Sequence, residues 1–147
     1  MIVTRIFAFI LLPVFLSSCN RDQNPRVVIE TTMGEITVEI YTDRAPVTAT
    51  NFLALVEKGS YAGAMFYRVV REDNQPDDRI RIGVIQGGLC LDSLIDLQDP
   101  IPHEPTGVTG IRHTDRTVSM ARNEPGTAST EFFICVGDQP SLDQGGL

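Results

Sequence analysis

The 147-residue chain carries few side chains of the types that react, bind metals or hold phosphates. Its two histidines, His103 and His113, have nine residues between them and no cysteine or carboxylate pattern around them, so they predict no metal site. Gly87 and Gly88 predict a turn, because neither a lysine nor a helix start follows them, as a phosphate-binding loop would require. We therefore expect chemistry that uses no metal and no other cofactor.

The charge balance excludes one class of partner. Lys and Arg total 12 against 19 Asp and Glu, which gives a net charge of -7 at pH 7. A protein that binds nucleic acid needs clustered cations against the phosphates, whereas the arginines of this chain are scattered and Lys58 is its single lysine. We therefore expect no nucleic-acid partner. The length and the 42% of apolar residues predict one domain with a packed core, and nothing predicts an oligomeric state.

The first 18 residues predict a signal for export. Arg5 precedes an apolar run at residues 6–16, and two serines follow, which is the order of a secretory signal. As a helix, the run of about 11 residues would reach roughly 16 Å, about half of a bilayer's hydrocarbon core. A buried N-terminal helix is the alternative, but the polar stretch at residues 20–24 follows the run at once and leaves it nothing to pack against.

Residues 16–19 (LSSC) resemble the lipobox of bacterial lipoproteins. In that family the cysteine is lipidated and becomes the mature N-terminus, so the resemblance implies a signal peptide at residues 1–18 and a lipidated Cys19 that begins a spacer at residues 19–25. It also implies a membrane-anchored protein of the cell envelope, outside the cytoplasm, on the periplasmic or the outer surface. Cys90 and Cys135 remain, and we expect two separate thiols, with a disulfide as the alternative in an oxidising compartment.

Strand patterns dominate the rest of the chain. Runs rich in β-branched residues at 26–32 and 35–41 flank Gly34, whose access to positive φ suits a tight turn, so they predict a hairpin. The second run alternates and would place Ile36, Val38 and Ile40 on one face. Further strands are predicted at residues 65–70, 79–86, 117–121 and 131–136, with a long surface excursion at residues 90–110.

One amphipathic helix is predicted at residues 47–58. Asp43 can cap it, Pro46 suits its first turn, and Gly59 ends it. Its apolar stripe consists of Ala49, Phe52, Leu53 and Val56. Together the elements predict a mainly β fold, in which a closed antiparallel barrel has a helix over one end.

Four segments, in this order, resemble the cyclophilin family of peptidyl-prolyl isomerases. They are residues 42–53 (TDRAP to NFL), 66–69 (FYRV), 85–88 (IQGG) and 119–134 (SMA to EFFI). The resemblance covers Val27 to about Gly146 and implies one cyclophilin-like domain at residues 26–147, a closed barrel with a helix over each open end. The chain stops at Leu147, where the family continues, so we expect this domain to be truncated and its barrel incomplete at the C-terminus.

The resemblance also implies roles for individual residues. Arg68 matches the catalytic arginine, and Gln86 matches the glutamine that holds the substrate backbone. Phe133 matches the floor of the proline pocket. The other expected substrate contacts are the walls Val84, Met120 and Leu142, the strand edge Ala121, Arg122 and Asn123, and Glu131, which replaces the usual glutamine.

These residues imply an isomerase that accelerates rotation of X-Pro bonds in exported proteins as they fold, with proline-containing polypeptides as substrates. Rotation about a peptide bond is opposed by roughly 18–20 kcal/mol because it breaks conjugation. A guanidinium aimed at the proline nitrogen would stabilise the twisted bond more than either planar form, without a nucleophile, metal or nucleotide. The alternatives are a non-catalytic cyclophilin-like module that binds proline peptides and an inactive fragment.

Three departures from the family pattern predict a modified site. The loop at residues 72–81 is longer than usual and is expected to narrow or gate the site. Gly83 and Ser141 stand where the family has aromatic residues around the proline, which predicts a weaker apolar grip. If the Glu131 carboxylate reaches Arg68, it would compete with the substrate, and Glu131→Gln would then raise kcat/KM.

Overall fold

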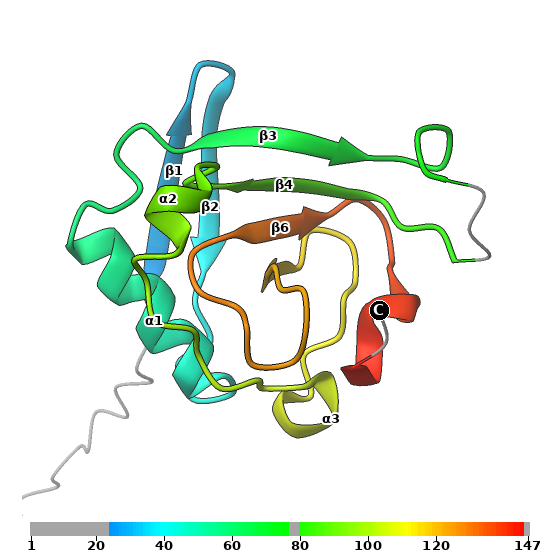
Figure 1. Ribbon diagram of the computed structural model, residues 1–147. Coiled ribbons are helices and arrows are strands. Elements are labelled where there is room, and N and C mark those ends of the chain that lie inside the picture. Colours follow the sequence, from blue (N-terminus) through cyan, green and yellow to red (C-terminus); the bar gives the residue numbers. More distant parts are fainter. Residues whose placement is uncertain (1–23, 77–79, 146–147) are drawn as a thin grey trace, which may run out of the picture.

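The computed structural model describes residues 24–76 and 80–145 (Figure 1). The predicted signal peptide, Cys19 and most of the spacer therefore lie outside the described residues. In the described part, no helix is long and apolar enough to cross a membrane. The strands are β1 (Arg26–Thr31), β2 (Gly34–Glu39), β3 (Met65–Val70), β4 (Val84–Gly88), β5 (Val118–Met120) and β6 (Phe132–Cys135). The helices are α1 (Pro46–Glu57), α2 (Asp92–Ile95), α3 (Thr106–Thr109) and the 3-10 helix η1 (Pro140–Gly145).

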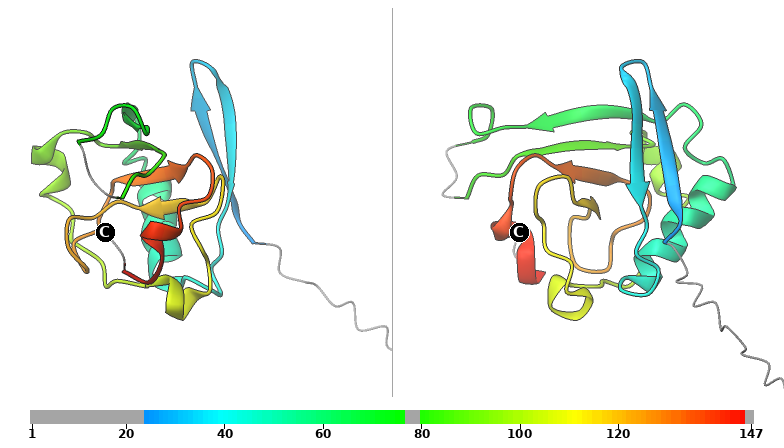
Figure 2. Two further views of the ribbon diagram at one scale, coloured as in Figure 1. Left: turned by 90° about the vertical axis from the view of Figure 1, so that its right-hand side faces the viewer. Right: turned by 180° about the vertical axis from the view of Figure 1, so that it is seen from behind.

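The strands form two antiparallel sheets, so the prediction of a mainly β fold is confirmed. One sheet is the β1–β2 hairpin, and the other has the order β3-β4-β6-β5. Figure 1 shows β3, β4 and β6 running alongside one another while the hairpin crosses them, and the rear view in Figure 2 shows the same crossing. Among the described strands, no ladder of hydrogen bonds joins the two sheets, so the closed barrel stays a prediction.

The hairpin forms where the alternating pattern predicted it. Val27 pairs with Val38, and the turn reaches β2 at Gly34, whose φ is +125°. Val38 and Ile40 are buried, as the predicted inner face requires. Next to this face lies a mainly apolar cavity of about 760 Å³ that residues of both sheets line, and Ile29, Ile36 and the β6 residue Phe132 are among them.

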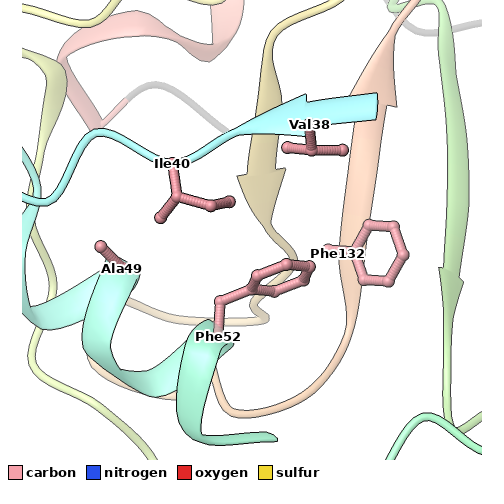
Figure 3. Close-up of a cluster of buried hydrophobic side chains, with 5 residues drawn as sticks. All are labelled: Val38, Ile40, Ala49, Phe52 and Phe132. Atoms are coloured by element: carbon pink, nitrogen blue, oxygen red, sulfur yellow. The ribbon is translucent and has the colours of Figure 1, made fainter. Parts of the chain in front are cut away.

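The main core lies between the hairpin, α1 and β6 (Figure 3). Its buried members are Val38, Ile40, Ala49, Phe52 and Phe132. Figure 3 shows the Phe52 ring reaching from α1 toward Phe132, and the two rings meet edge to face with centroids 5.7 Å apart. The buried face of α1 differs from the predicted apolar stripe. Leu55, which was not part of the prediction, is buried, whereas Leu53 and Val56 are only partly buried.

The first turn of α1 is capped from a distant part of the chain. Asp43, the predicted cap, is not the N-cap residue of α1. That position is taken by Ala45, whose side chain makes no capping hydrogen bond. The Glu104 carboxylate instead accepts hydrogen bonds from the backbone N–H of Val47 at 3.1 Å and of Thr48 at 2.7 Å. A carboxylate is favourable there because the first N–H groups of a helix have no partner within it. At the other end Gly59, with φ +68°, closes the helix as predicted.

The segment at residues 104–110 is held against the start of α1 at both of its ends. Glu104 binds the first turn of α1 from one end. At the other end, Arg44 donates from Nη2 to the Gly110 carbonyl at 2.6 Å and from Nε to the Thr109 carbonyl at 3.3 Å. Residues 104–110 therefore form an ordered strap, which contains α3 and ends the predicted surface excursion at residues 90–110; α2 lies earlier in that excursion.

Strand β4 differs from its prediction at both ends. It begins at Val84 because the Gln75 side chain binds both backbone groups of Ile82, accepting from its N–H and donating to its carbonyl. It continues through Gly87 and Gly88, so the predicted turn there is wrong. A Cβ on Gly87 would lie 2.8 Å from the Phe66 ring, which explains why this strand position has no side chain.

Cys90 and Cys135 are free thiols, as predicted. Cys135 ends β6 and is buried, and this burial is the main cause that raises the pKa of its thiol to about 11. A thiol with such a pKa is almost entirely protonated at neutral pH. Cys135 therefore acts as a small apolar core residue.

Candidate active site

A cavity of about 260 Å³ brings together most of the predicted site residues. They come from β3, β4, β5, β6 and η1, so the four-stranded sheet and the last helix position them together. The predicted residues that line the cavity are Arg68, Val84, Gln86, Met120, Ala121, Arg122, Phe133 and Leu142. Two predicted contacts, Asn123 and Glu131, are not among its lining residues. The roles of these residues toward a substrate stay predictions.

Arg68 reaches Gln86 because β3 contains a bulge. Phe66 pairs with Gly87 and Arg68 pairs with Gln86, so Tyr67 is an extra residue in β3. A bulge of this kind re-aims neighbouring side chains, which would otherwise alternate between the two faces of the sheet. Both Tyr67 and Arg68 contact the Gln86 side chain: Arg68 Nη1 donates to Oε1 at 3.2 Å, and Nε2 donates to the Tyr67 hydroxyl at 2.7 Å.

Glu131 is hydrogen-bonded to Tyr67 and makes no hydrogen bond or ion pair with Arg68. The hypothesis that its carboxylate reaches Arg68 is therefore wrong for this structure. Its side chain is turned into the protein, where the residue is only 8% exposed. Oε1 accepts from the backbone N–H of Leu89 at 2.7 Å and of Cys90 at 3.3 Å, and Oε2 accepts from the Tyr67 hydroxyl at 2.6 Å. In the structure Glu131 therefore connects to the cavity through Tyr67 and Gln86, and its expected contact with a substrate stays a prediction.

The position of Tyr67 also changes its acidity. Desolvation and the hydrogen bond to Glu131 raise the pKa of the Tyr67 hydroxyl to about 12. The hydroxyl therefore keeps its proton at any pH at which the protein would be assayed. A protonated hydroxyl can donate to the carboxylate and accept from the amide at the same time.

His113 is a cavity residue that the sequence did not suggest. Its ring stacks on Phe133, with centroids 5.8 Å apart and planes 17° from parallel. Nδ1 lies 3.0 Å from Asp143 Oδ1 and Nε2 lies 3.2 Å from Ser119 Oγ. The His113 backbone N–H also donates to Asp143, and chiefly this bond lowers the pKa of that carboxyl. Hydrogen bonds at both ring nitrogens therefore fix the orientation of the imidazole that stacks on Phe133.

A second wall of the cavity was also missed by the sequence analysis. It consists of residues 101–106, which include the start of the strap at residues 104–110, together with Gly126 and Ala128. The Ile101 N–H donates to the Ala128 carbonyl at 2.8 Å, and this bond joins the two parts of the wall. The segment has no periodic pattern, so its sequence carried no signal of this role.

The described residues of the other departures from the family pattern, namely Gly83, Ser141 and the loop at residues 72–81, do not line the cavity. Gly83 is not a lining residue, because a Cβ there would point at the Val136 carbonyl, 2.9 Å away; its neighbours Ile82 and Val84 line the cavity instead. Ser141 also does not line it, whereas Leu142 does. Of the described residues in the loop at 72–81, none lines the cavity, so the predicted narrowing of the site is not seen in that part of the loop.

Comparison with known proteins gives one consistent family. The family described as "Cyclophilin type peptidyl-prolyl cis-trans isomerase/CLD" matches residues 26–146. A peptidyl-prolyl cis-trans isomerase of Arabidopsis thaliana is 36% identical over 121 residues, which are 81% of this chain and 68% of the relative. One of Acinetobacter baylyi is 30% identical over 129 residues, 87% of this chain and 63% of the relative. The chain thus spans about two thirds of the length of these relatives.

The fold of the chain agrees with this family. The solved structure of a Cryptosporidium parvum cyclophilin-type isomerase matches with a TM-score of 0.60 and 23% identity, over 79% of this chain and 69% of that one. A second structure of that isomerase, in the presence of the dipeptide Ala-Pro, matches with a TM-score of 0.62. The residues that carried the resemblance lie within the matched range. The chain therefore belongs to the cyclophilin family of peptidyl-prolyl cis-trans isomerases.

Proposed function

We propose that this chain catalyses cis–trans rotation of X-Pro bonds in exported polypeptides, using Arg68 as the catalytic residue. The observation that carries this proposal is that the Arg68 guanidinium, hydrogen-bonded to Gln86, lines the same cavity as Phe133. An aromatic ring beside a fixed cation suits a proline ring and the amide nitrogen attached to it. The Ala-Pro dipeptide used with the Cryptosporidium relative supports proline peptides as the ligand class.

The chemistry follows from what changes during rotation. Twisting the X-Pro bond ends the conjugation of the nitrogen and leaves a localised lone pair on it. The Arg68 guanidinium carries N–H donors in a planar fork and can donate to that lone pair. Because the planar forms offer no such lone pair, the interaction is stronger in the twisted state, which is the condition for catalysis.

The remaining residues hold the two sides of the bond. Phe133, Met120 and Leu142 provide apolar contact for the proline ring, so that the preceding carbonyl turns. The Gln86 amide uses one N–H for Tyr67, and its second N–H can donate to the substrate backbone. Among the described strands β5 pairs with β6 alone, and its other edge is where we place an extended substrate peptide.

An isomerisation assay with a proline peptide tests the activity. Arg68→Ala should lower kcat/KM by about 10²–10³-fold, the usual effect of removing one donor that acts on developing charge. Arg71→Ala is the matched control, because Arg71 is an exposed arginine three positions on that pairs with Asp73 in the loop; it should retain wild-type activity. Wild-type activity no higher than the uncatalysed rate would refute the proposal.

A binding module without turnover is the second candidate. It is favoured by Gly83 and Ser141, which place no aromatic side chain at the cavity, so the grip on the proline ring comes from Phe133 and aliphatic residues. This candidate predicts that a proline peptide binds the wild-type protein without faster isomerisation. Exchange spectroscopy on the bound peptide measures both properties in one sample.

We also propose that the protein is exported and held on a membrane in the cell envelope by lipid on Cys19. The support is the order of a basic residue, an apolar run and the LSSC motif in residues 1–19. Cells that express the chain and are fed labelled palmitate should yield labelled protein in the membrane fraction. Cys19→Ser should abolish the label, while Cys90→Ser should leave it unchanged.

A further inference from the structure

A continuous chain of hydrogen bonds leads from the protein interior to the catalytic arginine. Glu131 Oε2 accepts from the Tyr67 hydroxyl at 2.6 Å, and that hydroxyl accepts from Gln86 Nε2 at 2.7 Å. At its outer end, Gln86 Oε1 accepts from Arg68 Nη1 at 3.2 Å. Tyr67 and Arg68 come from β3, Gln86 comes from the neighbouring β4, and Glu131 directly precedes β6, the next strand of the sheet, so the sheet itself fixes their spacing.

The direction of donation along this chain is fixed by its inner end. Glu131 Oε1 accepts from two backbone N–H groups, of Leu89 and Cys90, which orient the carboxylate. The Tyr67 hydroxyl donates its single proton to Glu131 Oε2, so it offers a lone pair to Gln86. This lone pair attracts the N–H₂ end of the Gln86 amide. The carbonyl end of the amide must then face Arg68, where it accepts from the guanidinium.

We propose that Tyr67 and Glu131 are positioning residues, which lock the orientation of the Gln86 amide and thereby hold the Arg68 guanidinium at the cavity. The inference rests on the proposed isomerase function, which it deepens by naming residues that act through others. Without the Tyr67 hydroxyl, the amide can turn over, and its N–H₂ end would then face the donors of Arg68. Two donors repel each other, so the guanidinium would lose its fixed place.

Three features of the structure support this assignment. The bulge at Tyr67 puts its hydroxyl on the same partner as Arg68, which regular alternation would not do. Glu131 is buried, and the backbone N–H of Leu89, the residue after β4, donates to its carboxylate. The inner end of the hydrogen-bond chain is therefore fixed in position. A Cβ on Gly88 would lie 2.5 Å from the Glu131 carboxyl group, so the backbone leaves space there for this carboxylate.

The first experiment compares two tyrosines. Tyr67→Phe removes the hydroxyl in the bond chain, whereas Tyr61→Phe removes a hydroxyl that donates to the Thr130 carbonyl at 2.8 Å, on the residue preceding Glu131. Tyr67→Phe should lower kcat about tenfold with KM within a factor of two, because the apolar contacts to the proline ring remain. Tyr61→Phe should lower the melting temperature but leave kcat unchanged. Equal kcat values for Tyr67→Phe and the wild type would overturn the proposal.

The second experiment separates positioning from a general structural role. In a Gln86→Leu background the link to Arg68 is already broken, so adding Tyr67→Phe should lower kcat no further. An equal fold-loss from Tyr67→Phe in both backgrounds would overturn the proposal. Glu131→Gln should also lower kcat/KM, because one of the two acceptor oxygens is replaced by a donor; a rise would contradict the assigned direction of donation.

A readout without activity keeps the two proposals apart. In nitrogen-15 spectra of the full chain, rotation about the Arg68 Nε–Cζ bond should be slow in the wild type and faster in Tyr67→Phe, with the Arg71 signals unchanged. If the wild type has no isomerase activity but shows this difference, the proposed function fails and the positioning role holds. If the Arg68 signals are the same in both proteins, the positioning role fails whatever the activity.

Discussion

Gly87 lies directly opposite Phe66 across β3 and β4, and the Phe66 ring occupies the space where a side chain at Gly87 would begin. The Phe66 ring also meets the Phe132 ring edge to face, with centroids 5.9 Å apart. The glycine therefore permits a close contact between the backbone of one strand and an aromatic ring of the next. This contact joins the strand that carries Gln86 to the core.

Gly87→Ala should destabilise the protein by about 1–3 kcal/mol, the usual cost of forcing an extra carbon into a packed site. The added Cβ would lie 2.8 Å from the Phe66 ring and 3.1 Å from the Met65 carbonyl, and the backbone atom cannot move aside easily. Chemical unfolding measures the change. Gly107→Ala is the control, because among the described residues no atom lies within 4 Å of its Cβ position; an equal loss in both variants would contradict the argument.

Glu104→Gln should lower the free energy of unfolding by about 1 kcal/mol, the typical value of a helix cap. The glutamine keeps one acceptor oxygen, so one of the two N–H groups of Val47 and Thr48 loses its partner. Amide exchange at these two residues should become faster. Glu124→Gln, at an exposed loop position, is the control and should change neither quantity.

Acid should weaken the protein partly through this same carboxylate. Desolvation alone would raise the pKa of Glu104, but the hydrogen bonds from Thr48 and Val47 outweigh it and lower the pKa below 4.5. The unfolded state therefore takes up the proton first as the pH falls, so stability present above about pH 4.5 is lost as the pH falls through the lowered value. Urea midpoints at pH 7 and below pH 4 should differ less in Glu104→Gln than in the wild type; the same difference in both would contradict this.

Alkali should weaken the protein through Tyr67. Desolvation and the bond to Glu131 raise the pKa of its hydroxyl from 10.0 to about 12, so the unfolded state loses the proton first. Stability present below pH 10 is then lost as the pH rises toward 12. Urea unfolding at pH 8 and pH 11 should show a smaller drop for Tyr67→Phe than for the wild type, and an unchanged drop would argue against the hydrogen bond to Glu131.

Phe133→Leu should raise KM about tenfold while kcat changes less, because a smaller apolar side chain loses contact with the proline ring in all of its states. His113 stacks on the phenylalanine ring and would lose this contact as well. Met33→Leu at the exposed hairpin tip is the control and should leave both constants unchanged. A fall in kcat alone would mean that Phe133 acts on the rotating bond rather than on the ring.

The sequence predicted the elements whose signals are local. Gly34 between two alternating runs predicted the hairpin, and the spacing of Ala49 and Phe52 between Pro46 and Gly59 predicted α1. The family motifs predicted the residues that meet at the cavity, because each motif lies on a strand that the sheet brings to the same place.

What the sequence did not predict depends on contacts between distant residues. The cap of α1 comes from Glu104, and no local pattern links a carboxylate to a helix start 56 residues away. The bulge at Tyr67 depends on the register between β3 and β4, so the inward turn of Glu131 and its bond to Tyr67 were not visible either. Gly87 and Gly88 were assigned to a turn because the aromatic ring and the carboxylate that exclude a side chain there come from other strands.

The strap at residues 104–110 ties the stability of one wall of the cavity to the helix beside it. Arg44 and Glu104 hold its two ends against residues 44–48. The wall can therefore swing outward only if α1 loses the cap that Glu104 supplies or Arg44 releases the carbonyls of the strap. A bulky substrate that needs a wider entrance must supply, from its own binding, the free energy of those hydrogen bonds.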